Sequence, residues 1–299
     1  MEEAVAYEIR KEVYAKFFIA APAGQDFFKQ SNTYLHLIAT KILEMTLELY
    51  RNPEKMVDDI SALGLRHVGY AIPTELFGPF VCTCLEVVTS RCKDEVSIEA
   101  FRWALGLISK SLVRTIMEGS TIVMKAINDN KKKTMRKAIA CAPRGERAAW
   151  MLTVQVGSQS ISPLAWAIES GSLEAASAIL QDLFTIRADR DRYYYGGDEL
   201  FVRHPNIIKL LTNHAPLLLP QLLDGLVWRS RLTSNGKRRV NYFIKHLMVT
   251  PEGEFAKTLQ WIERSRDPKI VCHPVLVVIS DMVWSRIACR SFLFRKSWL

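Results

Sequence analysis

The chain lacks the long apolar runs that a membrane-spanning helix requires. Such a helix needs about 18 uninterrupted apolar residues, and the most apolar stretch, Ile270–Trp284, is interrupted by a histidine, a proline and an aspartate. We expect no signal peptide, because Glu2 and Glu3 stand where its positively charged region would lie. A Gly-rich dinucleotide fingerprint is also missing, so we do not expect an enzyme.

Glycine, proline and strand-forming runs are scarce as well. Only 14 Gly and 12 Pro occur among 299 residues, of which 49% are hydrophobic, and β-branched runs of strand length are few. This composition predicts an all-α protein with enough apolar surface for two cores. The six cysteines lie mostly within apolar helical patterns, so we expect reduced thiols and a cytoplasmic protein.

One histidine stands at the end of an amphipathic helical pattern. His67 closes the pattern that contains Leu63, Gly69 and Pro73 then break the helix, and Thr74 beside the proline marks the start of the next one. A helix end followed by a bend gives the rigid support that imidazole needs to bind haem iron through a neutral ring nitrogen. His67 is therefore a candidate iron ligand, and a packed or exposed histidine is the alternative.

The order and spacing of Tyr14, Phe28 and His67 resemble the globin family. In that family the tyrosine lies over the distal face of the haem, the phenylalanine stacks on the porphyrin and the histidine is the proximal ligand. Ile72 matches the apolar residue at the haem edge, and Phe77 falls where the next helix reaches the proximal side. The resemblance implies haem b as the cofactor and His67 as the iron ligand. It also implies reversible binding of a diatomic gas, with oxygen as the leading candidate.

The globin resemblance extends over about residues 4–122. Two further amphipathic helices, expected over about 74–90 and 97–118, complete its pattern. Only about ten residues precede the helix that holds Tyr14, where a globin begins with a full helix. We therefore expect either a shortened globin or part of a longer polypeptide.

The distal side of the expected haem site depends on a helix predicted over about 33–50. The charged residues of this helix are expected to face solvent. The helical period then places Leu35 and Ile38 on the opposite, inward face. The distal residue is Tyr34, Leu35 or His36, of which His36 lies nearest the charged face. If the distal residue is apolar, the tyrosine of the first helix becomes the hydrogen-bond donor to the bound gas.

A second recognisable pattern follows a basic stretch. Ser162 with the next two residues starts a short helix, Gly171 provides a turn, and a second helix presents Leu173 and Ile179 on one face. This segment resembles one ankyrin repeat. Because one repeat cannot bury its own face, neighbours of similar shape are required. We predict an irregular, ankyrin-like helical array, through which a protein partner binds.

The C-terminal segment carries aromatic and basic residues. His273-Pro-Val and the run from Trp284 through Arg286 to Arg290 resemble the helix before the first membrane span of ankyrin-bearing channels of the transient-receptor-potential type. The resemblance implies a membrane portion beyond Leu299, at whose cytosolic face the chain would lie. The alternative is a basic amphipathic helix that packs on the array.

The predicted organisation is a globin-like haem domain over 1–122, an ankyrin-like region over 123–265 and a basic helical segment over 266–299. In the first hypothesis the haem domain binds a diatomic gas as the sensor or regulatory part of a larger ankyrin-bearing protein. In the second, haem is lost and the chain is a helical interaction scaffold, the cytosolic part of a membrane channel. We expect no nucleic acid partner despite the net charge of +9, because two aspartates offset the basic and aromatic run over 187–195.

Overall fold

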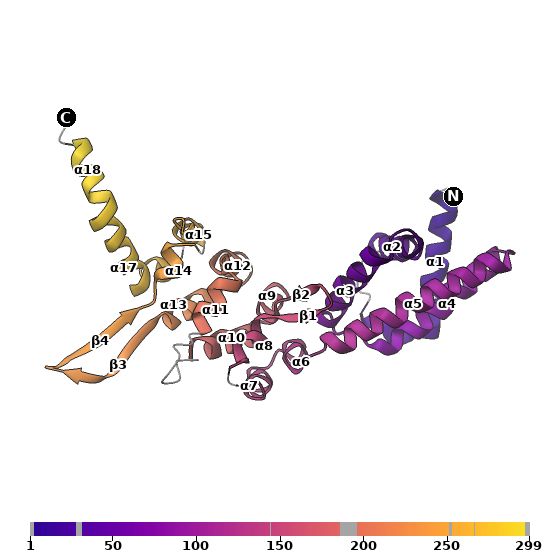
Figure 1. Cartoon of the computed structure of the whole chain (residues 1–299), viewed down its shortest axis with the longest axis horizontal. Coiled ribbons are helices and arrows are strands. Elements are labelled where there is room, and N and C mark those ends of the chain that lie inside the picture. The colour runs from indigo at the N-terminus through magenta and orange to yellow at the C-terminus, as the bar shows by residue number, and fades with distance from the viewer. Residues whose placement is uncertain are drawn as a thin grey trace. The chain divides into compact units, whose positions relative to one another are not determined.

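The computed structural model describes residues 3–27, 32–143, 145–185, 196–250, 253–265 and 267–296. Helices account for 76% of it and strands are few and short, which confirms the predicted all-α class (Figure 1). Contacts between Cα atoms divide the chain into two compact units. Unit 1 is Met1–Asn128 with Val154–Ile161, and unit 2 is Asp129–Thr153 with Ser162–Leu299. The domain boundaries predicted from the sequence stay predictions, although the return of 154–161 to unit 1 was not among them.

Unit 1 is a group of packed helices with one short hairpin. Its elements are α1 (Glu3–Ala20), η1 (Pro22–Asp26), α2 (Asn32–Arg51), α3 (Pro53–Gly69), η2 (Thr74–Leu76), α4 (Phe77–Arg91), α5 (Glu95–Gly119), α6 (Ile122–Asp129), β1 (Val154–Val156) and β2 (Gln159–Ile161). Helix α3 packs on α5 and α2, and α4 packs on α1 and α5. The helices expected over 33–50, 74–90 and 97–118 are therefore present as α2, α4 and α5.

Helix α3 carries His67, and local signals set both of its ends. The Asn52 side chain caps the first turn by accepting from the Lys55 amide at 3.1 Å, and Pro53 supplies the first helical residue. After Gly69 the chain turns at Ala71, whose φ of 54° lies in the left-handed region. The helix thus ends two residues after the histidine, as the sequence predicts.

The crossing of α3 and α5 is unusually close. A Cβ atom on Gly64 would lie 2.4 Å from Cγ2 of Thr115 and 2.7 Å from its Cβ. The Thr115 hydroxyl donates to the Ser111 carbonyl at 3.0 Å, which fixes that side chain. Only glycine allows this approach, and it lies one helical turn before His67.

The hairpin of β1 and β2 belongs to unit 1 although two helices of unit 2 precede it in the chain. Strand β1 contacts α5, and β2 contacts α3. The Ser158 hydroxyl donates to the Asp58 carboxylate, and Gly157 turns with a φ of 58°. The hairpin therefore covers the same two helices that meet at Gly64.

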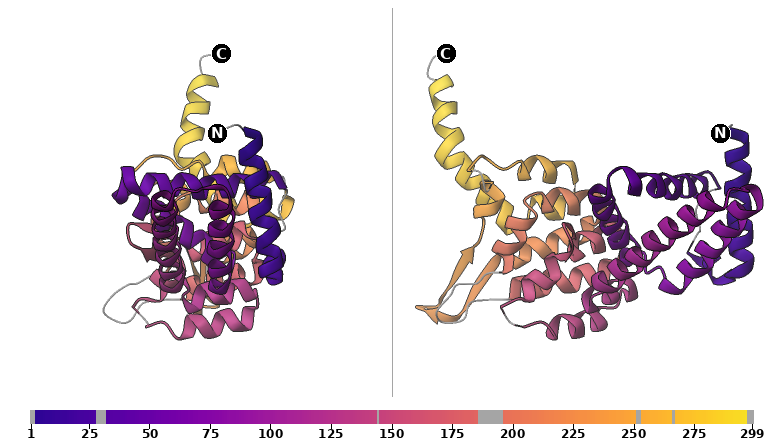
Figure 2. Two further views of the ribbon diagram at one scale, coloured as in Figure 1. Left: turned by 90° about the vertical axis from the view of Figure 1, so that its right-hand side faces the viewer. Right: turned by 45° about the vertical axis from the view of Figure 1, so that its right-hand side comes forward.

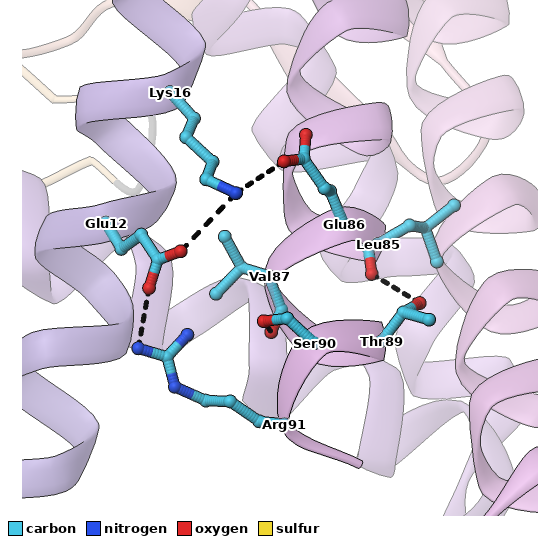
Figure 3. A network of polar contacts seen from close by, with 8 residues as sticks. All are labelled: Glu12, Lys16, Leu85, Glu86, Val87, Thr89, Ser90 and Arg91. Atoms are coloured by element: carbon cyan, nitrogen blue, oxygen red, sulfur yellow. Dashed lines mark hydrogen bonds and ion pairs between the residues drawn. The ribbon is translucent and has the colours of Figure 1, made fainter. Parts of the chain in front are cut away.

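Ion pairs align α1 with α4 (Figure 3). Arg91 Nη2 lies 2.6 Å from Glu12 Oε2, and Lys16 pairs with both Glu12 and Glu86. The hydrogen bond from Arg91 holds the pKa of Glu12 below its ordinary value. Buried Val87 packs between the two helices in a cluster with Val13, Cys84 and Leu105. This apolar cluster supplies the cohesion, because exposed pairs contribute little.

Unit 2 contains the remaining helices and a longer hairpin. Its elements are α7 (Lys132–Ala140), α8 (Arg147–Leu152), α9 (Pro163–Glu169), α10 (Leu173–Thr185), α11 (Gly196–Arg203), α12 (Ile207–His214), η3 (Pro216–Leu218), α13 (Leu219–Gly225), β3 (Val227–Ser234), β4 (Lys237–Tyr242), α14 (Lys245–Met248), α15 (Thr258–Ser265), α16 (Pro268–Val271), α17 (Pro274–Val283), η4 (Trp284–Ala288) and α18 (Cys289–Lys296).

The helices of unit 2 pack in two rows. Helices α7, α10 and α13 contact one another in that order, and α9, α12 and α15 do the same. Helix α10 lies at the centre and buries Ala176, Ile179 and Leu183 among its seven buried residues. The Asn130 side chain caps α10 by accepting from the amides of Glu174 and Ala175, at 3.1 and 3.2 Å. The helix–turn–helix predicted from Ser162 onward is present as α9 and α10.

Strands β3 and β4 form an antiparallel hairpin inside the region predicted to be helical. Asn235 and Gly236 make its turn, with φ values of 51° and 72°, as in the two-residue turns that match strand twist. Val227 pairs with Tyr242, Ser234 pairs with Lys237, and the register shifts between Arg229 and Thr233. This hairpin was not among the features predicted for the irregular helical array.

Candidate functional site

His67 lies in the last turn of α3, half-buried, with its ring orientation fixed by the backbone. Its Nδ1 is 2.8 Å from the Leu63 carbonyl oxygen, one turn earlier. A carbonyl only accepts, so Nδ1 carries the proton and Nε2 keeps the free electron pair. Burial lowers the pKa of His67 more than the bond to Leu63 raises it, so the neutral ring is favoured. A neutral imidazole with a free Nε2 is the form that binds a metal.

The segment after His67 brings two predicted site residues to it. The Ile72 amide donates to the His67 carbonyl at 3.1 Å and closes the turn between the helices. The Phe77 ring, in the first turn of α4, lies 5.5 Å from the imidazole, centroid to centroid, with the planes tilted by 49°. The bend predicted from Gly69 and Pro73 therefore returns the chain to the histidine.

Tyr14 belongs to an aromatic cluster made by α1, η2 and α4. It is 5% exposed and packs with Phe17 and Leu76, and half-buried Ile72 and Phe80 lie against the same cluster. The Tyr14 ring centroid is 6.0 Å from that of Phe18 and 6.1 Å from that of Phe80. Burial, assisted by nearby Cys84, raises the pKa of Tyr14. The phenol thus keeps its proton well above neutral pH.

The structure connects four of the predicted site residues. Tyr14 and Ile72 lie in one cluster with Leu76, and the next residue, Phe77, contacts His67. Phe28 lies outside the described residues. For Leu35 and Ile38, and for Tyr34 and His36 as distal candidates, the structure describes the α2 backbone but not the side chains. The distal side of the site therefore stays a prediction.

Phe17, Phe80 and Leu76 were not among the predicted site residues, although they build the cluster around Tyr14. A signal was present, because Tyr14 and Phe17 are three residues apart on one helix, as are Phe77 and Phe80 on another. Beside Phe80 lies a cavity of about 30 Å³, lined by apolar side chains and by Arg10, which donates to the Thr40 hydroxyl at 2.7 Å. It holds about one or two water molecules, far less than a porphyrin.

Other ligand sites find no support in the part of the chain that the structure describes. There, no three His, Cys, Asp or Glu side chains gather in an arrangement that would hold a metal ion. Nor is any helix of the described segments both long and apolar enough to cross a bilayer. No protein-family model, curated protein or solved structure matches the chain. His67, Phe77 and the cluster around Tyr14 form the candidate functional site.

Proposed function

We propose that unit 1 binds haem b through Nε2 of His67 and reversibly binds a diatomic gas, with oxygen as the leading candidate. In this proposal unit 1 is the sensor or regulatory part of a larger ankyrin-bearing protein. The observation that carries the proposal is the bond between Nδ1 and the Leu63 carbonyl. It selects the tautomer and the ring orientation that an iron ligand needs, as the partner groups of metal-bound histidines generally do.

The residues around His67 fit an iron porphyrin in their chemistry. When bound, the haem iron supplies reversible coordination of the gas. His67 would hold the iron, while Phe77 and the cluster of Tyr14, Ile72 and Phe80 would exclude water from the ring. Phe28, Leu35 and Ile38 enter the site only through the globin resemblance. Haem iron needs one protein ligand, so a group of several metal-binding side chains is not required.

Entry of the porphyrin requires the aromatic cluster to open. The cavity of about 30 Å³ is too small for the ring, but Phe77 and Phe80 are only half-buried. Their rings can turn outward without breaking a hydrogen bond. We therefore expect near-ultraviolet circular dichroism to change on haem addition, while the far-ultraviolet helical signal stays constant.

A regulatory role is proposed because the same chain carries the stacked helices of unit 2. Stacked helical pairs build extended binding surfaces for other proteins, and the two helix rows of unit 2 follow that plan. The alternative is a haem-free scaffold, in which the same surface binds partners and His67 is a packed core histidine.

The test is an absorption spectrum of the full 299-residue chain titrated with haem. We expect a saturable Soret band at one haem per chain, retained in His214→Ala, whose histidine is exposed. His67→Ala should lose the band or shift it to that of free haem. The absence of a band from the wild-type protein would leave the scaffold as the function.

A cavity variant separates loss of the ligand from loss of the fold. His67→Gly leaves room for free imidazole, which should restore the wild-type spectrum when added in excess. Circular dichroism of the same sample checks that the helices remain. If His67→Gly binds haem with an unchanged spectrum before imidazole is added, His67 is not the iron ligand.

A further inference from the structure

The β3–β4 hairpin lies in a span of unit 2 whose charges are all of one sign. Between Asp224 and Glu252 the sequence contains no acidic residue. It contains six basic ones over the same span: Arg229, Arg231, Lys237, Arg238, Arg239 and Lys245. A run of this kind carries a strong positive potential.

The structure leaves the three charges that follow the turn of the hairpin exposed. Lys237, Arg238 and Arg239 are exposed, and no carboxylate of the described segments forms an ion pair with any of them. Arg238 shares a face of the ribbon with Val240 and its partner Arg229, whereas Lys237 and Arg239 lie on the other face. Figures 1 and 2 show the hairpin running out beyond the helices of unit 2. The ribbon is positive on both faces.

A second exposed element of unit 2 combines apolar and basic side chains. Along η4 and α18, Trp284 is 51% exposed, Phe292 49%, Leu293 59% and Phe294 72%. Arg286 and Arg290 are exposed in the same stretch. The phosphates of a nucleic acid would pair with the basic side chains, but they would not bind the several exposed apolar side chains. A bilayer interface accommodates both.

We propose that unit 2 binds the surface of a bilayer rich in anionic phospholipid, with the β3–β4 hairpin as its electrostatic arm. The headgroups attract the arginines and the lysine at the tip, which follow the two-residue turn at Asn235 and Gly236. The exposed side chains of η4 and α18 add apolar contact with the interface. The inference is independent of haem binding.

The experiment is co-sedimentation of the full chain with vesicles of phosphatidylcholine, with and without 30 mol% phosphatidylserine. The test variant removes three charges at the tip, Lys237→Gln, Arg238→Gln and Arg239→Gln. The matched control removes three exposed charges from helices of the same unit, Lys133→Gln, Lys137→Gln and Lys209→Gln. Each basic residue at an anionic surface changes the partition coefficient by about fivefold.

We expect binding to the phosphatidylserine vesicles only, weakening as salt is raised. The tip variant should lose at least about tenfold in partition coefficient, and the helix control should lose much less. Equal losses in the two variants would overturn the assignment to the hairpin. If a DNA duplex at matched phosphate concentration displaces the protein from the vesicles, the partner is a nucleic acid and the bilayer proposal is wrong.

Discussion

At the scale of single residues, His67 is held by two backbone bonds. Its Nδ1 faces the Leu63 carbonyl, and its own carbonyl accepts from the Ile72 amide. The first bond fixes the direction of the ring and the second fixes the corner that follows. Backbone bonds thus set both the ring and the turn between α3 and α4.

Protonation of His67 should weaken unit 1 in mild acid. Burial lowers the pKa of His67 in the folded state, whereas the unfolded chain keeps the ordinary value of about 6.5. As pH falls below about 6.5, the unfolded state binds more protons and the free energy of unfolding decreases; above that value the contribution is complete. Urea unfolding of the haem-free chain between pH 7.5 and 5 measures this slope.

The comparison for this pH effect is His67→Gln, which cannot titrate. Its slope should be shallower than that of the wild-type chain. The residual slope includes His204 in unit 2, whose pKa burial also lowers. Identical slopes in the two proteins would show that His67 titrates normally in the folded chain.

Tyr14 should slow gas release from the haem-loaded protein. Because burial raises its pKa, its hydroxyl remains a hydrogen-bond donor at neutral pH. Tyr14→Phe removes that donor, and we expect the oxygen dissociation rate to rise about tenfold, the effect of one hydrogen bond of about 1.4 kcal/mol. Stopped-flow displacement of oxygen measures the rate. Tyr70→Phe, at a residue 62% exposed, should leave it unchanged, and an unaltered rate in Tyr14→Phe would assign the donor elsewhere.

At the scale of elements, the crossing of α3 and α5 positions the histidine. Gly64 lets the two backbones approach, and the side chains of Leu65 and Val68 reach Gly119 at the end of α5, where an added Cβ would lie 3.0 and 3.1 Å from them. The last two turns of α3 are thus in tight contact with α5 at both ends, at Gly64 and at Val68. Those turns cannot slide without changing where His67 lies.

Gly64→Ala should destabilise unit 1 by about 1 to 3 kcal/mol, the usual cost of overpacking a close contact. The new Cβ would lie 2.4 Å from Cγ2 of Thr115, whose hydroxyl bond prevents an easy rotation. Gly106→Ala in α5 is the control, since nothing lies within 4 Å of a Cβ there. That change should be neutral or stabilise by up to about 1 kcal/mol. The midpoints of urea unfolding measure the stability of both variants. Equal midpoints would contradict the close crossing of α3 and α5.

The helices were readable from the sequence because their signals are local. Asn52 with Pro53 and the glycine and proline after His67 mark the ends of α3, and apolar spacing marks α5. The hairpin of β3 and β4 was missed although Asn235 and Gly236 form a strong two-residue turn signal. A half-buried strand is recognised by alternating apolar and polar residues. These strands carry arginines and lysines at such positions, so hydrophobic periodicity does not predict them.

The site was only partly predictable for a different reason. The globin spacing predicts Tyr14, His67, Ile72 and Phe77. The structure places Tyr14 and Ile72 in the cluster with Leu76, and the next residue, Phe77, contacts His67. Phe80 was absent from the prediction because its role depends on how α1 meets α4. That contact is between elements: the spacing of Phe77 and Phe80 indicates a shared helix face, but it does not specify which helix that face contacts.

At the scale of the whole molecule, the chain passes between the two units three times. It leaves unit 1 after Asn128, returns at Val154 and leaves again after Ile161. The intervening residues form α7 and α8 of unit 2. Sequence neighbours on either side of Thr153 therefore belong to different compact units.

Hydrogen exchange should reveal this division. Amides of 154–161 should exchange with the opening free energy of α3 and α5, and those of α7 and α8 with that of α10. Gly64→Ala should accelerate the first group and leave the second unchanged. Mass spectrometry of peptides on either side of Thr153 provides the measurement. If the peptides from 132–152 and 154–161 respond alike to the substitution, the two segments open as one.

The position of the β1–β2 hairpin also has a consequence for synthesis on the ribosome. Unit 1 lacks the cover over α3 and α5 until residue 161 has emerged, after α7 and α8 have already been made. During that interval α7 and α8 exist without α9 and α10, their partners in unit 2. The nascent chain thus carries two unfinished units at once, and the arrival of a few strand residues completes the first before the second can close.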